Sequence, residues 1–195
     1  MTISRFTRST PVLVLFLLIV SPLTTELRAQ DEETSPTLEP RIEDVESIDA
    51  IISAVYDVIS GPASEERDWD RFLSLFAPNA RLIPTARTPD GEVTLRVMSP
   101  QDYVERATGF FKQPGGFFEH EIGRETEEYG NIAHVFSSYA SFREGEDEPF
   151  MRGINSFQLF RHGDRWSVVS IFWDSERADN PIPEKYLFES DSDSD

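Results

Sequence analysis

The three histidines, His120, His134 and His162, are the side chains of this sequence that change charge most readily near neutral pH. His162 lies in a His-Gly-Asp turn signal and is expected to be solvated. Strand alternation places His134 and His120 each on a face shared with apolar residues, so we expect both to point inward. His134 is then either a general base or a neutral, hydrogen-bonded core residue. The histidines lack metal-ligand spacing and the chain has no cysteine, so no metal site is predicted.

Two further polar positions could take part in chemistry or binding. Asp174, followed closely by Glu176, stands where the last strand leaves the sheet, and such a carboxylate could do acid–base work if its pKa were raised. Otherwise both are solvated charges. Asn155 is a candidate hydrogen-bond partner for a ligand, or else satisfies the backbone at a strand irregularity. The sequence contains no nucleophile-elbow motif and no phosphate-binding glycine loop.

Three helices are predicted to position these groups. Apolar residues recur at helical spacing over 48–59, 69–76 and 100–111. Asp68 is a plausible N-cap of the second helix, and Ser99, followed by proline and by an acid three residues on, begins the third. Gly61-Pro62, Pro78-Asn79 and Pro114-Gly115-Gly116 end the three segments.

Strands dominate the second half of the chain. Two short strands are predicted at about 80–86 and 92–98, and four long ones at 117–127, 132–143, 151–161 and 165–174. Tight turn signals separate the last four, and strands joined in this way pair antiparallel. Helices followed by a meander predict an α+β fold, a cone-shaped curved antiparallel sheet wrapped around three helices in the N-terminal half.

The ends of the chain differ from this domain. Residues 1–29 combine two early arginines, an apolar run at 12–20 and Ala29 at a small-residue cleavage site, which predicts a signal peptide and a periplasmic or secreted protein. Residues 30–42 are read as an acidic linker, 43–188 as the domain, and 189–195 as a disordered acidic tail. Removing residues 1–29 leaves 15 basic and 35 acidic residues, a net charge of −20. Such a charge argues against nucleic acid and against an anionic membrane surface as partners.

The order of elements and several stretches resemble the nuclear transport factor 2-like, or SnoaL-like, superfamily, in particular its bacterial members. The stretches that carry the resemblance lie at 76–82 (FAPNARL), 130–137 (GNIAHVFS), 152–159 (RGINSFQL), 165–170 (RWSVVS) and 173–176 (WDSE). The likeness spans about residues 45–188. The catalytic carboxylates of the ketosteroid isomerase and limonene epoxide hydrolase members have no matching positions here.

The resemblance implies a cone with a cavity for a small, largely apolar ligand, and no cofactor. We expect its walls and hydrogen-bonding groups to include Trp69, Phe76, Tyr103, Phe110, Phe111, His120, Asn155 and Trp173, with His134 and Asp174 as candidate catalytic residues. Three readings stay open: a binding domain for an apolar or amphipathic molecule, a cofactor-independent isomerase, dehydratase or hydrolase, and a homodimeric accessory domain with a filled cone. Because strand 132–142 is apolar on both faces, a homodimer through the outer sheet face is expected.

Overall fold

The computed structural model describes residues 38–188. The predicted signal peptide (1–29), most of the predicted linker and the predicted tail (189–195) lie outside the described residues. Within 38–188, no helix is both long and apolar enough to cross a membrane.

Four α-helices precede or interrupt the sheet: α1 (Ile42–Val45), α2 (Ile48–Ile59), α3 (Trp69–Ser74) and α4 (Pro100–Phe111). The three predicted helices are present, and the short α1 was not predicted. Residues close in sequence determine where α3 and α4 begin. The side chain of Asp68 accepts a hydrogen bond from the Arg71 N–H, and Ser99 and Asp102 form a reciprocal capping box. The two caps thus fix the first residues of both helices.

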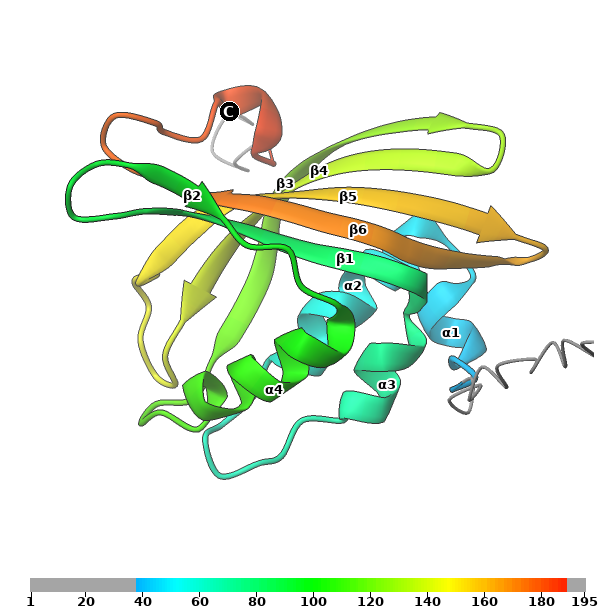
Figure 1. Ribbon diagram of the computed structural model, residues 1–195, viewed down its shortest axis with the longest axis horizontal. Helices are drawn as coiled ribbons and strands as arrows, with labels where there is room; N and C mark the ends of the chain where they lie inside the picture. Colours follow the sequence, from blue (N-terminus) through cyan, green and yellow to red (C-terminus); the bar gives the residue numbers. More distant parts are fainter. Residues whose placement is uncertain (1–37, 189–195) are drawn as a thin grey trace, which may run out of the picture. The chain divides into compact units, whose positions relative to one another are not determined.

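Six strands form one curved sheet: β1 (Phe76–Arg87), β2 (Val93–Leu95), β3 (Phe118–Tyr129), β4 (Ile132–Phe142), β5 (Met151–His162) and β6 (Arg165–Ser175). The strand order is β2-β1-β6-β5-β4-β3. The helices lie on its concave side (Figure 1). The α+β cone is therefore confirmed, with one difference: β1 and β6 pair in parallel, so the sheet is mixed. Tight turns dictate direction only between consecutive strands, and β1 and β6 are not consecutive.

The start of β1 also differs from the prediction, which extended the second helix to Phe76 and began the strand near residue 80. The strand begins at Phe76 and contains an irregularity, because Asn79 adopts a left-handed backbone with φ of 62° and the register with β6 shifts after Phe76. Pro78-Asn79 is thus a kink inside a strand.

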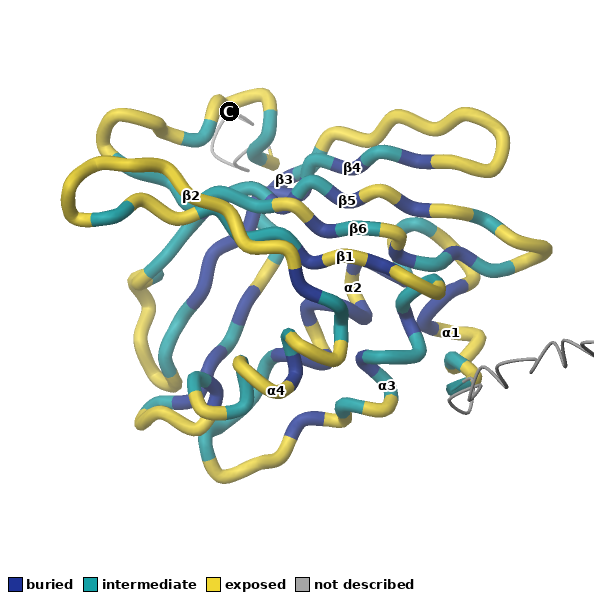
Figure 2. The backbone as a smooth tube through the Cα atoms, in the orientation of Figure 1, coloured by how far each residue is buried: buried dark blue, intermediate teal, exposed yellow. Residues whose placement is uncertain are grey.

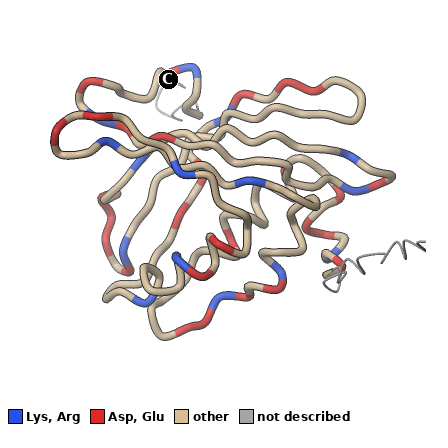
Figure 3. The backbone as a smooth tube through the Cα atoms, viewed as in Figure 1, with Lys and Arg blue, Asp and Glu red and all other residues tan. Residues whose placement is uncertain are grey.

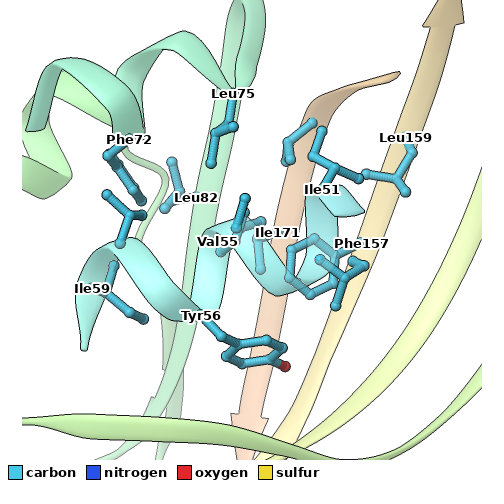
Figure 4. Packing of buried hydrophobic residues seen from close by; sticks show 14 of the residues in the cluster. Ile51, Val55, Tyr56, Ile59, Phe72, Leu75, Leu82, Phe157, Leu159 and Ile171 are labelled. Carbon is cyan, nitrogen blue, oxygen red and sulfur yellow. The ribbon is translucent and has the colours of Figure 1, made fainter. Parts of the chain in front are cut away.

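The apolar stripe of α2 forms the centre of the core. Ile51 and Ile52 are fully buried, and Val55 and Ile59 continue the same face toward the sheet. These side chains meet inner-face residues of β5 and β6 (Figure 4). Buried positions alternate along the strands and gather on the helix sides that face the sheet (Figure 2). Dense packing around α2 holds one end of the cone rigid.

A C-terminal segment, residues 176–188, covers part of the outer sheet face (Figure 1). It contains a 3-10 helix, Glu184–Tyr186, whose Tyr186 ring stacks on Phe136 with centroids 5.4 Å apart. The backbone N–H of Phe188 donates to the carbonyl of Ile122 at 2.9 Å.

Candidate functional site

A cavity of about 580 Å³ lies between the concave sheet face and helices α2, α3 and α4. Its walls are mainly apolar. The aromatic part of the lining consists of Phe72, Tyr103, Phe110, Phe111, Phe117, Tyr139, Phe157 and Trp173. Volume and composition are those of a small-molecule site.

Five of the predicted site residues line this cavity: Tyr103, Phe110, Phe111, Asn155 and Trp173. The first three come from one face of α4, and the last two from neighbouring positions on β5 and β6. Helical spacing and cross-strand pairing thus bring together residues that are up to 70 positions apart in the chain.

Trp69 and Phe76 do not line the cavity. Trp69 packs behind its wall, with ring centroids 5.8 Å from Phe72 and 5.7 Å from Phe111, and Phe76 packs 4.8 Å from Phe72. Both side chains support wall residues and belong to the core cluster. The expectation that they contact a ligand directly is corrected to a supporting position.

The two candidate histidines lie on the outer face of the sheet. His134 Nε2 is 3.1 Å from Ser156 Oγ, and its ring meets Phe136 edge-on at 4.9 Å. His120 is exposed and lies 5.6 Å from Phe142. The residues of β4 that alternate with His134 lie on the inner face of the sheet, and one of them, Val135, is fully buried. The inward placement of both histidines was therefore wrong.

Asp174 does not have the environment of a general base. It accepts hydrogen bonds from Thr85 Oγ1 at 2.7 Å, from the Ser175 N–H at 2.9 Å, and from two nitrogens of Arg177 at 2.7 and 2.9 Å. The hydrogen bond from Arg177 is the main reason that the pKa of Asp174 falls to about 2. A carboxylate this weakly basic holds β6 to its surroundings, and it does not line the cavity.

Glu119 on β3 is the ionisable group that sequence reasoning missed. Its carboxylate lines the cavity, only 8% of the residue is exposed, and Ser141 Oγ donates to its Oε2 at 2.7 Å. Burial raises the pKa of Glu119 to about 7, against the lowering effect of hydrogen bonds from Ser141 and Asn155. The one available signal was alternation with Phe117, a buried aromatic two residues earlier.

A chain of hydrogen bonds fixes the orientation of Asn155. Ser137 Oγ donates to Glu121 Oε1 at 2.5 Å, so its oxygen is free to accept from the Tyr56 hydroxyl at 2.7 Å. Tyr56 then accepts from Asn155 Nδ2 at 3.1 Å. Because a carboxylate only accepts, the direction of every bond in this chain follows from Glu121, which is in turn paired with Arg124. Asn155 therefore keeps its amide nitrogen toward Tyr56.

Two tyrosines give the cavity neutral hydrogen-bond donors. Burial, with the nearby Glu119 carboxyl, raises the pKa of Tyr139 to about 12, and the same two causes raise the pKa of Tyr103. Their hydroxyls stay protonated at neutral pH, while Glu119 changes charge there. Phenol donors beside a carboxyl with a near-neutral pKa, in an apolar cavity, can bind a polar ligand group or move a proton. Among residues 38–188, no group of three or more His, Asp or Glu side chains is placed to hold a metal ion.

Comparison with solved structures identifies the architecture. A nuclear transport factor 2-like protein of unknown function from Pseudomonas putida superposes with a TM-score of 0.51 at 11% identity, covering 70% of this chain and 90% of that one. The chain has the nuclear transport factor 2-like fold. A protein of unknown function with a cystatin-like fold from Nostoc punctiforme gives a TM-score of 0.51 at 9% identity, over 67% of this chain and 90% of that one.

The nuclear transport factor 2-like fold was the resemblance predicted from the sequence, and it is confirmed. No family model matches the sequence, and no curated protein matches it. At 9–11% identity, likeness to these structures establishes the fold alone. Function has to be argued from the cavity.

Proposed function

We propose that the protein binds a small, largely apolar molecule in its cone cavity, with a polar group of that molecule held at Glu119 and Asn155. The observation that carries this proposal is the cavity of about 580 Å³ with a buried glutamate, Glu119, in its lining. Open apolar volume with a few convergent polar groups is the usual form of a ligand site. A filled cone, as in a purely structural accessory domain, would leave no such volume.

A neutral fluorescent probe, N-phenyl-1-naphthylamine, tests the cavity directly. We expect saturable binding to the wild-type protein and its loss in Ala107→Phe, because Ala107 lines the cavity and a phenyl ring there would fill part of it. Ala178→Phe adds the same ring to an exposed position and is the matched control. Equal binding to wild type and Ala107→Phe would refute the proposal. If the probe binds in the cavity, native mass spectrometry of protein purified from its own host should identify the natural ligand.

The position of Glu119 favours a second candidate, a cofactor-independent proton-transfer enzyme. The Glu119 carboxylate would take a proton from a carbon beside a carbonyl, while a hydroxyl of Tyr103 or Tyr139 donates to the carbonyl oxygen that gains charge. Return of the proton to another carbon gives isomerisation, and its return to a leaving hydroxyl gives dehydration with release of water. This mechanism replaces the predicted base His134 by Glu119.

Proton–deuterium exchange separates the two candidates. A panel of cyclic ketones is incubated in D₂O, and loss of the α-proton signal is followed by NMR. An enzyme should accelerate exchange in the wild-type protein, with a rate that rises as pH passes about 7, where Glu119 loses its proton. Glu119→Gln should abolish the acceleration and keep binding of the neutral probe. If every ketone exchanges only at the rate measured in buffer, the enzyme candidate is excluded and the binding function remains.

We further propose an exported homodimer that associates through the outer sheet face. Support comes from apolar side chains that remain exposed there in the single chain, Ile132, Phe160, Val169 and Phe172. The C-terminal segment covers a neighbouring part of that face, which reduces the area left for a partner. Light scattering at micromolar concentration should give twice the mass of one chain. The intact mass of exported protein should correspond to a chain that begins at Gln30.

A further inference from the structure

Within residues 38–188, two arginines at the cavity have no hydrogen-bond or ion-pair partner for their side chains, unlike the other arginines of this range. Residues 38–188 contain 13 arginines. Eleven of them donate a side-chain hydrogen bond or form an ion pair with another described residue. The two exceptions are Arg96 and Arg106, and both line the cavity.

The fold places both guanidinium groups at the solvent side of the cavity. Arg106 is exposed and lies three residues after Tyr103 on α4, so it continues the cavity-lining face of that helix. Arg96 is exposed just beyond β2, where its backbone N–H donates to the carbonyl of Pro84 at 3.1 Å. Glu119, by contrast, is at the buried end.

The side chain of Asp102, one turn before Arg106 on α4, is engaged mainly by the helix cap. Asp102 accepts hydrogen bonds from the N–H and hydroxyl of Ser99 in the capping box, at 2.9 and 2.7 Å. It attracts Arg106 electrostatically without forming a hydrogen bond to it. The charged residues of the cavity lining are Arg96, Arg106 and Glu119. The cavity lining therefore carries two positive groups and one buried carboxyl. Acidic residues are spread over the helices, strands and turns of residues 38–188 (Figure 3), and the net charge of the chain is −18.

We infer that the ligand is an amphipathic anion, whose apolar body lies among the aromatic walls and whose carboxylate, sulfonate or phosphate group is bound by Arg96 and Arg106. This inference rests on the proposed binding function and adds the chemical class of the ligand. Guanidinium groups are the preferred partners of such anions because their N–H donors match the oxygens in geometry and charge. An acidic surface repels anions elsewhere, so the arginine pair also directs the ligand to the mouth.

A pair of probes with the same ring system tests this assignment. 1-Anilinonaphthalene-8-sulfonate is anionic, and N-phenyl-1-naphthylamine lacks the sulfonate. In the variant Arg96→Gln/Arg106→Gln we expect the dissociation constant of the anionic probe to rise about 4- to 25-fold. Each exposed arginine contact contributes about two- to fivefold, and the two factors multiply. The dissociation constant of the neutral probe should not change. Higher salt should weaken binding of the anionic probe only.

Two controls guard the interpretation. Arg87→Gln removes one positive charge from the same β1–β2 hairpin, but Arg87 pairs with Asp179 and does not line the cavity, so binding of the anionic probe should be unaffected. Arg96→Lys/Arg106→Lys keeps both charges and should retain most of the preference for the anion. An unchanged anionic affinity in the double glutamine variant, or an equal loss in Arg87→Gln, would overturn the inference and leave the cavity function intact. If neither probe binds the wild-type protein, the proposed function itself fails.

Discussion

Replacing Glu119 by glutamine should stabilise the protein at neutral pH. In the folded chain burial raises the pKa of Glu119 to about 7, whereas the pKa of a glutamate in the unfolded chain is near 4.5. Glutamine has the same shape, needs no proton to remain neutral, and its amide oxygen can still accept the hydrogen bond from Ser141 that Glu119 Oε2 accepts. The substitution therefore removes the penalty on the charged form and keeps the local contact.

The sign and size of the effect follow from proton linkage. Below pH 4.5 the carboxyl is protonated in both states, so Glu119 adds no penalty. Between about pH 4.5 and 7 the unfolded state releases the proton while the folded state keeps it, so rising pH lowers the free energy of unfolding. Above pH 7 the difference is constant. The pKa difference corresponds to a loss of about 3 kcal/mol, as an order of magnitude, which Glu119→Gln should recover.

Urea unfolding followed by tryptophan fluorescence, at pH values from 4.5 to 8.5, measures this difference. The free energy of unfolding of Glu119→Gln minus that of wild type should rise from near zero at pH 4.5 to its plateau above pH 7. Glu128→Gln, an exposed substitution on the same strand, should stay close to wild type throughout. A difference that does not change with pH, or a Glu119→Gln variant less stable than wild type at pH 8, would refute the buried-carboxyl assignment.

Three other substitutions test the surroundings of the cavity. Tyr56→Phe removes the hydroxyl that accepts from Asn155 and should lower the free energy of unfolding by about 1–3 kcal/mol in urea titrations, since buried partners lose their bonds. Gly123→Ala would bring a Cβ within 2.2 Å of the Tyr186 carbonyl oxygen, so limited proteolysis should cleave the displaced C-terminal segment faster than in wild type. His134→Gln lies on the outer sheet face and should leave the dissociation constant of N-phenyl-1-naphthylamine unchanged; a large loss of affinity would mean that His134 reaches the ligand.

The helices and strands could be predicted because their signals are local. The capping serine, proline and acid at 99–102 begin α4 where the structure has it, and the turn signals after residues 129, 144 and 161 separate the strands of the meander. Such signals act between residues a few positions apart, so a sequence alone reveals them. The parallel pairing of β1 with β6 depends on distant segments and had no local signal.

The faces of the strands could not be predicted in the same way. Along β4 both alternation sets are apolar, so hydrophobic patterning did not indicate whether His134 or Val135 meets the helices. On β3 the question was the same for His120 and Glu119, and a glutamate is ordinarily expected to be exposed. A register shift between Glu121 and Gly123 further breaks the alternation that such reasoning depends on. The predicted ligand-binding residue His120 is therefore the neighbour of Glu119 in sequence but lies on the opposite face of the strand.

The position of Glu119 is informative because an apolar residue there would make a more stable protein at neutral pH. A leucine would be buried among the apolar lining of the cavity without the penalty of about 3 kcal/mol and would reduce the open volume of the cone. Asn155, which also lines the cavity, is held in one orientation by its hydrogen bond to Tyr56. A destabilising carboxyl and an oriented amide at an unfilled apolar volume therefore support the proposal that the cavity binds a ligand.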